Sequence, residues 1–279
     1  MNKTGAFKPI VITPPNRLEL PDFREVWEYR DLLWLLTKRD LKVRFQQTAI
    51  GVLWIILQPL LLMAIFTIIL GILIRVPTGG IPYPVFFLSG YVVWQFFSQV
   101  VNTSAYSFIN NIGVITKSYF PRLALPFSSI LSSLIDFVIS FLVLLPFLIS
   151  NHYPISIRFL LIPILLIITT FFSSGVGLIF GALMVIFRDI KNLLVFIMMI
   201  WMYITPIMFP ISIVPEEYQI LFFINPLTSL VESFRWVFLN DGVLPSSINL
   251  IISFAVAFTT WCVGVIAFRS MENKIADVL

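Results

Sequence analysis

Cysteine and histidine are almost absent from this sequence of 279 residues, which has one of each, Cys262 and His152. A single cysteine excludes an intrachain disulfide, a thiolate zinc cluster and a CxxC redox pair. The motifs GxxxxGK[ST], HExxH and GxSxG are also missing. We therefore expect a chain that is not an enzyme, binds no cofactor or metal and does not itself hydrolyse nucleotide.

Charged residues are scarce as well, at 11% of the chain, whereas hydrophobic residues reach 59%. Soluble domains have roughly 25% charged and 45–50% hydrophobic residues, so the excess of hydrophobic residues here indicates a membrane protein. A helix needs about 20 apolar residues to cross the hydrocarbon. Six runs meet this requirement, and we expect an all-α membrane protein with six transmembrane helices. The predicted spans are 50–74, 83–101, 127–149, 159–187, 193–213 and 248–268.

The basic residues lie at the edges of these runs, and nine of the eighteen precede residue 45. The N-terminal segment lacks the short apolar region and cleavage site of a signal peptide, so we expect it to stay attached. With the N-terminus in the cytoplasm, fifteen basic residues fall inside and three outside, as the positive-inside rule requires. Six crossings then predict that both termini are cytoplasmic.

The first 47 residues divide into a tail, 1–21, to which we assign no role, and a segment with helical periodicity, 22–47. Phe23, Trp27, Leu33 and Trp34 fall on one predicted side of that helix, with charged residues on the other. This pattern predicts an interfacial amphipathic helix. It is equally typical of a helix packed on the cytoplasmic ends of the protein's own spans. The remainder, 48–279, is predicted to be the transmembrane domain.

Between the fifth and sixth predicted spans, two apolar stretches are too short to cross the membrane, 218–224 and 227–239, and Asn225-Pro226 separates them. We expect a re-entrant helical hairpin, which is tolerated only where protein or a water-filled cavity covers its turn. Glu232 and Arg235 have i,i+3 spacing and are predicted to pair on one helix face.

Within the spans, Asp136 is the clear acidic candidate for function, because a carboxylate at membrane depth is costly unless it is paired, neutral or hydrated. A structural hydrogen bond to a neighbouring helix explains it equally well. Several side chains in the spans are candidates to face a conduit, although packing is the commoner role of an aromatic residue. They are Trp54, Gln58, Trp201 and Tyr203.

Two short segments between spans combine charge with apolar residues. In 110–126, aromatic and basic side chains lie between helix-stopping prolines, a pattern that suits docking into a soluble partner, although a loop that only sets topology is the plain alternative. Its candidate docking residues are Lys117, Tyr119, Phe120, Pro121 and Arg122. Arg188 and Asp189 form a smaller version of the same pattern between the fourth and fifth spans.

Several stretches resemble the permease subunit of ABC-2 type polysaccharide exporters, the family that includes O-antigen (Wzm-type) and teichoic-acid exporters. They are LTKRDLKVRFQQTAIGVLWIILQPLL at 36–61, VITKSYFPRLALP at 114–126, FRDIKNL at 187–193, and 201–239, which begins WMYITPIMFP. The resemblance runs from about residue 22 to the C-terminus.

The resemblance implies a homodimer of this chain that forms a channel for a lipid-linked glycan, with two ATP-binding cassette subunits that bind ATP and Mg²⁺. It implies a bacterial inner-membrane location. The segment carrying Lys117 to Arg122 would be a coupling helix that docks on the ATPase. Arg39 and Asp40 would lie near the same interface, and Asn225, Pro226, Glu232 and Arg235 would belong to an outer gate.

The main hypothesis is ATP-driven export of a lipid-linked polysaccharide from the cytoplasmic side. Within transport, a teichoic-acid or other polyol-phosphate polymer, or a small amphiphile, is the alternative cargo. An ion-coupled secondary carrier is the competing class. The scarcity of charge within the spans argues against it.

Overall fold

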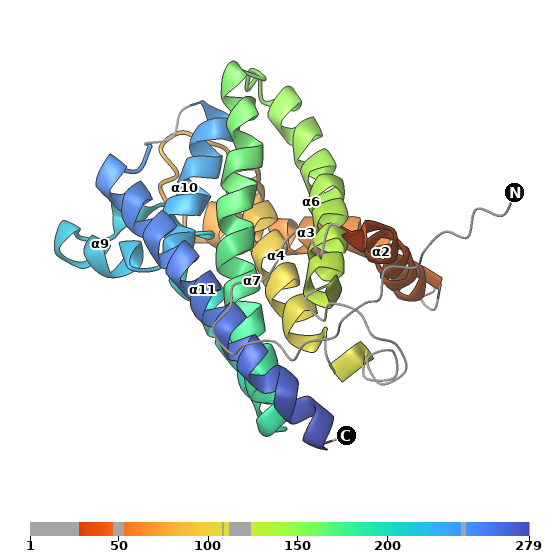
Figure 1. Cartoon of the computed structure of the whole chain (residues 1–279). Helices are drawn as coiled ribbons and strands as arrows, with labels where there is room; N and C mark the ends of the chain where they lie inside the picture. The colour runs from red at the N-terminus through yellow and green to blue at the C-terminus, as the bar shows by residue number, and fades with distance from the viewer. Residues whose placement is uncertain (1–27, 47–52, 108, 112–123, 241–243, 279) are drawn as a thin grey trace, which may run out of the picture.

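The computed structural model describes residues 28–46, 53–107, 109–111, 124–240 and 244–278, and all regular structure in these residues is helical (Figure 1). This agrees with the predicted all-α class. The helices are α2 (Arg30–Gln46), α3 (Leu53–Phe66) continued by a π-helical stretch (Thr67–Leu73), α4 (Tyr83–Tyr106), α6 (Ala124–Ser150), α7 (Ile162–Ile186), α8 (Ile190–Ile204), α9 (Glu216–Phe223), α10 (Pro226–Leu239) and α11 (Ser247–Val278). Short 3₁₀ turns occupy Ile109–Asn111, Ile157–Leu161 and Ile211–Ile213.

Five helical segments of the described chain are long and apolar enough to cross a membrane: Leu53–Leu73, Tyr83–Tyr106, Ala124–Ser150, Ile157–Ile186 and Ser247–Ser270. They correspond to the first four predicted spans and to the sixth. The predicted fifth span, 193–213, is not one continuous helix, because α8 has only 15 residues and ends at Ile204. Thr205 is extended and precedes Pro206, which disfavours helical backbone at the residue before it. Six crossings therefore stay a prediction.

Proline and asparagine set the boundaries of α10, and the break at Asn225-Pro226 falls where the sequence predicts it. Asn225 caps α10, its side-chain oxygen accepting a hydrogen bond from the amide of Leu227 at 3.2 Å, and Pro226 takes the first helical position. Asn240, in the left-handed conformation with φ 57°, ends the helix. The two short helices α9 and α10 are thus present, while their depth in the membrane stays a prediction.

Helix α4 is the central element, since most of its residues are buried, whereas few residues of the span that contains α3 are. It packs against α6, α7 and α10. Glycines allow the closest approach to α7: a Cβ on Gly177 would lie 2.8 Å from the carbonyl oxygen of Val101, and one on Gly181 would lie 3.1 Å from that of Ala105. Small residues four apart are the usual means of close helix packing in membranes.

A second close crossing joins α7 to α11, which lie side by side along much of their length (Figure 1). A Cβ on Gly264 would lie 2.5 Å from the carbonyl oxygen of Gly175, and one on Gly175 would lie 2.6 Å from the amide nitrogen of Trp261. Only glycine at both positions fits this crossing. The C-terminal span is thereby fixed to the core.

Helix α2 differs from the predicted amphipathic arrangement. Leu33 and Leu36 are buried against Ala124 and Leu125 at the start of α6, whereas Trp34 is 53% exposed. Placing Leu33 and Trp34 on one side was therefore wrong, since neighbouring helical positions point about 100° apart. Leu33 and Leu36 agree with the alternative in which this helix packs on the ends of the protein's own spans. The exposed Trp34 is available to lie at the membrane–water interface.

Candidate functional site

Arg235, in the middle of α10, is the most deeply buried charged side chain among the described residues, with 2% of its surface exposed. Its guanidinium donates to the carbonyl oxygens of Pro206 at 2.6 Å and Ile207 at 2.7 Å. It also forms an ion pair with Glu232 at 2.9 Å, the partner that the i,i+3 spacing predicts. A buried cation requires this kind of pairing.

Helix α4 forms the other side of the arginine site. The guanidinium carbon lies 3.8 Å from the ring centre of Phe86, a cation–π contact. A Cβ on Gly90 would lie 2.8 Å from Nη2 of Arg235, so a glycine here leaves room for the guanidinium. The hydroxyl of Tyr83 donates to the carbonyl oxygen of Met208 at 2.9 Å. The sequence analysis missed Tyr83, Phe86 and Gly90, because these contacts join positions more than 100 residues apart.

Asn225 connects the corner between α9 and α10 to the end of α8. Its amide nitrogen donates to the hydroxyl of Thr205 at 3.0 Å, and its amide oxygen accepts from the indole of Trp201 at 3.1 Å. The same oxygen caps α10 through Leu227. One asparagine therefore satisfies three groups from two segments, which its two donors and two acceptor sites allow.

The four predicted gate residues come together on the irregular segment that follows α8. Asn225, at the start of α10, bonds to Thr205. Arg235, nearly three turns further on and paired with Glu232, bonds to the carbonyl oxygens of Pro206 and Ile207. This arrangement ties α10 to segment 205–208. The two would have to move together unless the buried arginine loses its partners.

The predicted conduit residues do not form one cluster. Trp54 and Tyr203 are exposed, at 51% and 55%, and Gln58 is exposed too. Trp201 is instead half-buried, with its ring centre 5.2 Å from that of Phe97. Together with its bond to Asn225, this contact gives Trp201 a packing role. Whether any of the four faces a conduit stays a prediction.

Asp136 is buried, with 5% of its surface exposed, on the face of α6 that packs against α4. The hydroxyl of Ser140, one turn on, donates to the backbone oxygen of Asp136 at 2.9 Å and to the side-chain oxygen of Gln95 on α4 at 3.1 Å. Asp136 thus lies one turn from a polar contact between α6 and α4 that Ser140 makes, and whether its carboxylate has a structural or a functional role stays a prediction.

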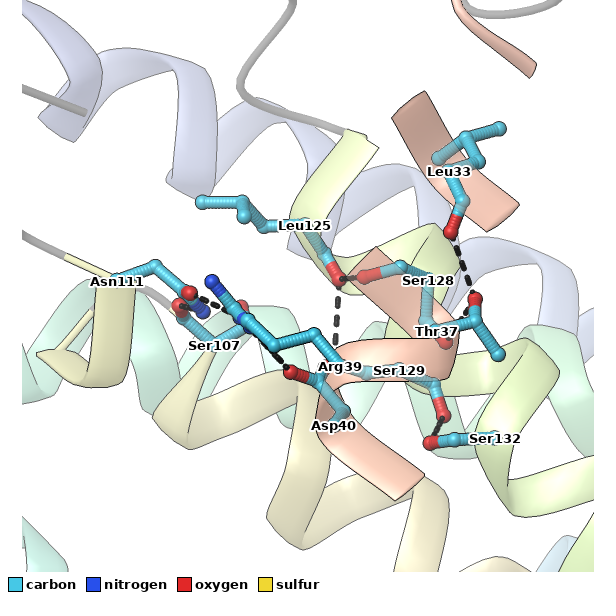
Figure 2. A network of polar contacts seen from close by, with 10 residues as sticks. All are labelled: Leu33, Thr37, Arg39, Asp40, Ser107, Asn111, Leu125, Ser128, Ser129 and Ser132. Carbon is cyan, nitrogen blue, oxygen red and sulfur yellow. Dashed lines mark hydrogen bonds and ion pairs between the residues drawn. The ribbon is translucent and has the colours of Figure 1, made fainter. Parts of the chain in front are cut away.

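A polar network joins α2 to the ends of α4 and α6 (Figure 2). Arg39 pairs with Asp40 at 2.7 Å and donates to the side-chain oxygen of Asn111, whose amide donates to the backbone of Ser107 at 2.7 Å. The hydroxyl of Thr37 lies 3.3 Å from the carbonyl oxygen of Ser128. Helix α2 therefore contacts both residue 111 and the start of α6, on either side of segment 112–123.

The remaining coupling candidates cannot be placed in this network. Arg188 and Asp189 lie exposed between α7 and α8. The main docking residues lie outside the described residues: Lys117, Tyr119, Phe120, Pro121 and Arg122. Asn111, which the sequence analysis did not single out, directly precedes that segment and is 6% exposed.

No group of three or more histidine, cysteine, aspartate or glutamate side chains positioned for a metal ion occurs in the described part of the chain. The polar sites of the described residues are built from hydrogen-bonding groups and one buried ion pair. Such an arrangement positions helices and presents polar surface.

The sequence matches a known protein family and several named proteins. Residues 31–239 match the family described as ABC-2 type transporter. An O-antigen export system permease protein RfbA of Klebsiella pneumoniae is 33% identical over 250 residues, which cover 89% of this chain and 95% of the relative. A protein of the same name from Myxococcus xanthus is 28% identical over 91% of this chain and 97% of its own length. A polysialic acid transport protein KpsM of Escherichia coli is 26% identical over 84% of this chain and 91% of its own length.

The family match extends from α2 to the last residue of α10 and so includes both the α2 network and the buried arginine site. The chain is a member of the ABC-2 type transporter family.

Proposed function

We propose that this chain is the membrane-spanning permease of an exporter that moves a lipid-linked polysaccharide, of the O-antigen kind, out of the cytoplasm. The observation that carries the proposal is the match to O-antigen export permeases over nearly the whole of both chains. Five membrane-spanning candidates and a sequence without catalytic motifs fit a transporter subunit. The inner membrane of a bacterium is its expected location, with both termini cytoplasmic.

ATP hydrolysis for export has to take place in a partner, because the sequence has no nucleotide-binding loop. Membership of the ABC-2 family implies an ATP-binding cassette subunit. We infer an assembly of two copies of this chain and two ATPase subunits, in which the ATPase binds ATP and Mg²⁺. In the span Leu53–Leu73, which the rest of the chain scarcely covers, Ile65, Ile68 and Ile72 are each about half exposed, an apolar face that either lipid or a second copy would cover.

The α2 network supplies a route by which movement of the ATPase reaches the spans. Arg39 holds Asn111, which bonds back to Ser107 just after α4, and Leu33, Leu36 and Thr37 hold the start of α6. Segment 112–123, with the predicted docking residues, lies between these two anchors in the sequence. A force applied there passes into α4 and α6 together, because both are fixed to the same helix.

The docking role is tested with purified permease and its cognate ATPase subunit. The wild-type chain is expected to form a complex and to stimulate ATP hydrolysis. A double variant, Phe120→Ala with Arg122→Ala, should insert into the membrane and remain folded but lose that stimulation, because aromatic and arginine side chains dominate docking energy. Arg75→Met, an exposed change elsewhere on the chain, is the control. Full stimulation by the double variant would contradict the docking role, and no complex with the wild-type chain would contradict the function.

A second cargo has support from one comparison. The relatives named polysialic acid transport protein indicate an anionic polysaccharide as the alternative. Deleting the gene and identifying the glycan that accumulates inside the cells separates the two. A neutral glycan on a lipid carrier agrees with the main proposal, and a polyanionic polymer agrees with the alternative.

A further inference from the structure

Helix α4 has an unusual distribution of polar residues for the central helix of a bundle. From Val85 to Tyr106, every aliphatic side chain and every phenylalanine is buried, while all the half-exposed positions carry polar or tyrosine side chains. Five of these positions form what we term the α4 polar stripe: Gln95, Ser98, Gln99, Asn102 and Thr103. Their spacing of three and four residues places them on one helix face.

Helix α6 extends the polar surface. Ser140 donates to the side-chain oxygen of Gln95 at 3.1 Å, and the hydroxyls of Ser133 and Thr103 lie 3.4 Å apart. Asn102 bonds back to the carbonyl oxygen of Ser98 at 2.8 Å. With the buried Asp136 between the two serines, the stripe and the facing side of α6 form one polar band a little over two helical turns long.

The opposite side of α6 has the reverse character. Leu131, Val138 and Leu142 are 39%, 53% and 56% exposed, as expected of side chains that face lipid. The polar and apolar exposed surfaces of this pair of helices are therefore separate. Hydrocarbon suits the apolar side, whereas half-exposed amides and hydroxyls at membrane depth require water, a polar ligand or another polar protein surface.

The chemistry of the band restricts the ligand. Neither α4 nor α6 contains lysine or arginine, so the band offers neutral donors and acceptors together with one carboxylate. Such groups match the hydroxyls of sugar rings, each of which both donates and accepts. A chain of phosphate groups would instead require cations.

We propose that the α4 polar stripe lines a water-filled path through the membrane and that its side chains contact the hydroxyls of the glycan in transit. This inference rests on the proposed function for the identity of the ligand, but not for the presence of water. It places the hydrated surface on α4 rather than at the aromatic residues Trp54, Trp201 and Tyr203.

Cys262 makes the test direct, since Cys262→Ser yields a chain without cysteine. Ser98→Cys or Asn102→Cys is then introduced into that background, in the full chain assembled with its ATPase subunit in membrane vesicles. The probe is a small charged methanethiosulfonate, which reacts only with hydrated thiolates. Val138→Cys and Leu142→Cys are the lipid-facing controls, and Val93→Cys is the buried control.

We expect both stripe positions to react at least about tenfold faster than the three controls, because hydrocarbon suppresses formation of the thiolate. Labelling should also slow glycan export in the Ser98→Cys and Asn102→Cys variants. The same treatment of the Leu142→Cys variant, on the lipid side, should leave export unchanged.

Stripe cysteines that react no faster than the controls would overturn the water-filled path. So would stripe cysteines that escape the reagent and cross-link to a second copy on oxidation, because the stripe would then be a dry dimer interface. Rapid labelling without any effect on export would overturn the contact with glycan. The labelling needs no transport, so a chain that exports no glycan but labels at the stripe would contradict the proposed function alone.

Discussion

Replacing Arg235 with methionine tests whether the buried guanidinium holds α10 to segment 205–208. Methionine fills similar space but leaves the Glu232 carboxylate without its ion-pair partner and the Pro206 and Ile207 carbonyl oxygens without a donor. Removing one partner of a buried ion pair costs about 3–5 kcal/mol. We expect a loss of that size in the free energy of unfolding, which corresponds to a melting temperature lower by on the order of 10 °C.

The assay is the fraction of detergent-solubilised protein that remains monodisperse after heating. Arg75→Met, the same chemical change at an exposed position, should behave as wild type. Adding Glu232→Gln to Arg235→Met should recover part of the loss, since the uncompensated carboxylate is then gone. An Arg235→Met variant as stable as wild type, with no further effect of Glu232→Gln, would refute this account of the site.

Two further changes test the packing and the helix cap. Gly264→Ala should strongly impair folding, because its Cβ would lie 2.5 Å from a backbone oxygen of α7. The change Val263→Ala, at the neighbouring exposed position, should be tolerated. Equal yields of folded protein from the two variants would contradict the close crossing of α7 and α11. Asn225→Ala should lower the free energy of unfolding by about 1 kcal/mol for the lost helix cap, and by more for the lost bonds to Trp201 and Thr205. Thermal stability is compared with that of Asn192→Ala, a change at an exposed asparagine. Equal stabilities of the two variants would count against the Asn225 hydrogen bonds.

Long apolar runs allowed much of the fold to be predicted, since hydropathy depends only on local sequence. The runs around α4, α6 and α7 became helices within about five residues of their predicted limits, and α11 begins within one residue of its predicted start but continues ten residues past its predicted end. The Asn225-Pro226 break also appeared as expected, because capping and proline effects are local. The predicted fifth span is not one continuous helix, because α8 ends at Ile204, just before Thr205-Pro206, and whether it crosses the membrane stays a prediction.

The site was only partly predictable, because its contacts join distant segments. The sequence indicates that Glu232 and Arg235 can pair, but it does not indicate that Arg235 also binds the carbonyls after α8 or lies on Phe86. Similarly, an aromatic residue within a span, such as Trp201, is a candidate to line a conduit, and the sequence does not indicate that it packs against Phe97. Whether such a side chain packs or faces a conduit depends on which side of its helix is buried, and a single sequence does not indicate that.

The polar residues of α4 illustrate the same difference. Polar interruptions of the second apolar run look alike in the sequence, yet Ser89 is fully buried and bonds the carbonyl oxygen of Phe86 at 2.8 Å, whereas Gln95 and Ser98 are half-exposed. Only the packing of α6 and α7 around α4 divides them into a structural hydroxyl and a polar surface.

The most direct test of the central claim is the location of the glycan in cells that lack this chain. Surface glycan and glycan in the cytoplasmic fraction are measured in the deletion strain, with and without a plasmid that carries the gene. We predict that lipid-linked glycan accumulates inside the deletion strain and returns to the surface with the plasmid. Undiminished surface glycan in the deletion strain, with none accumulating inside, would contradict the assignment as its export permease.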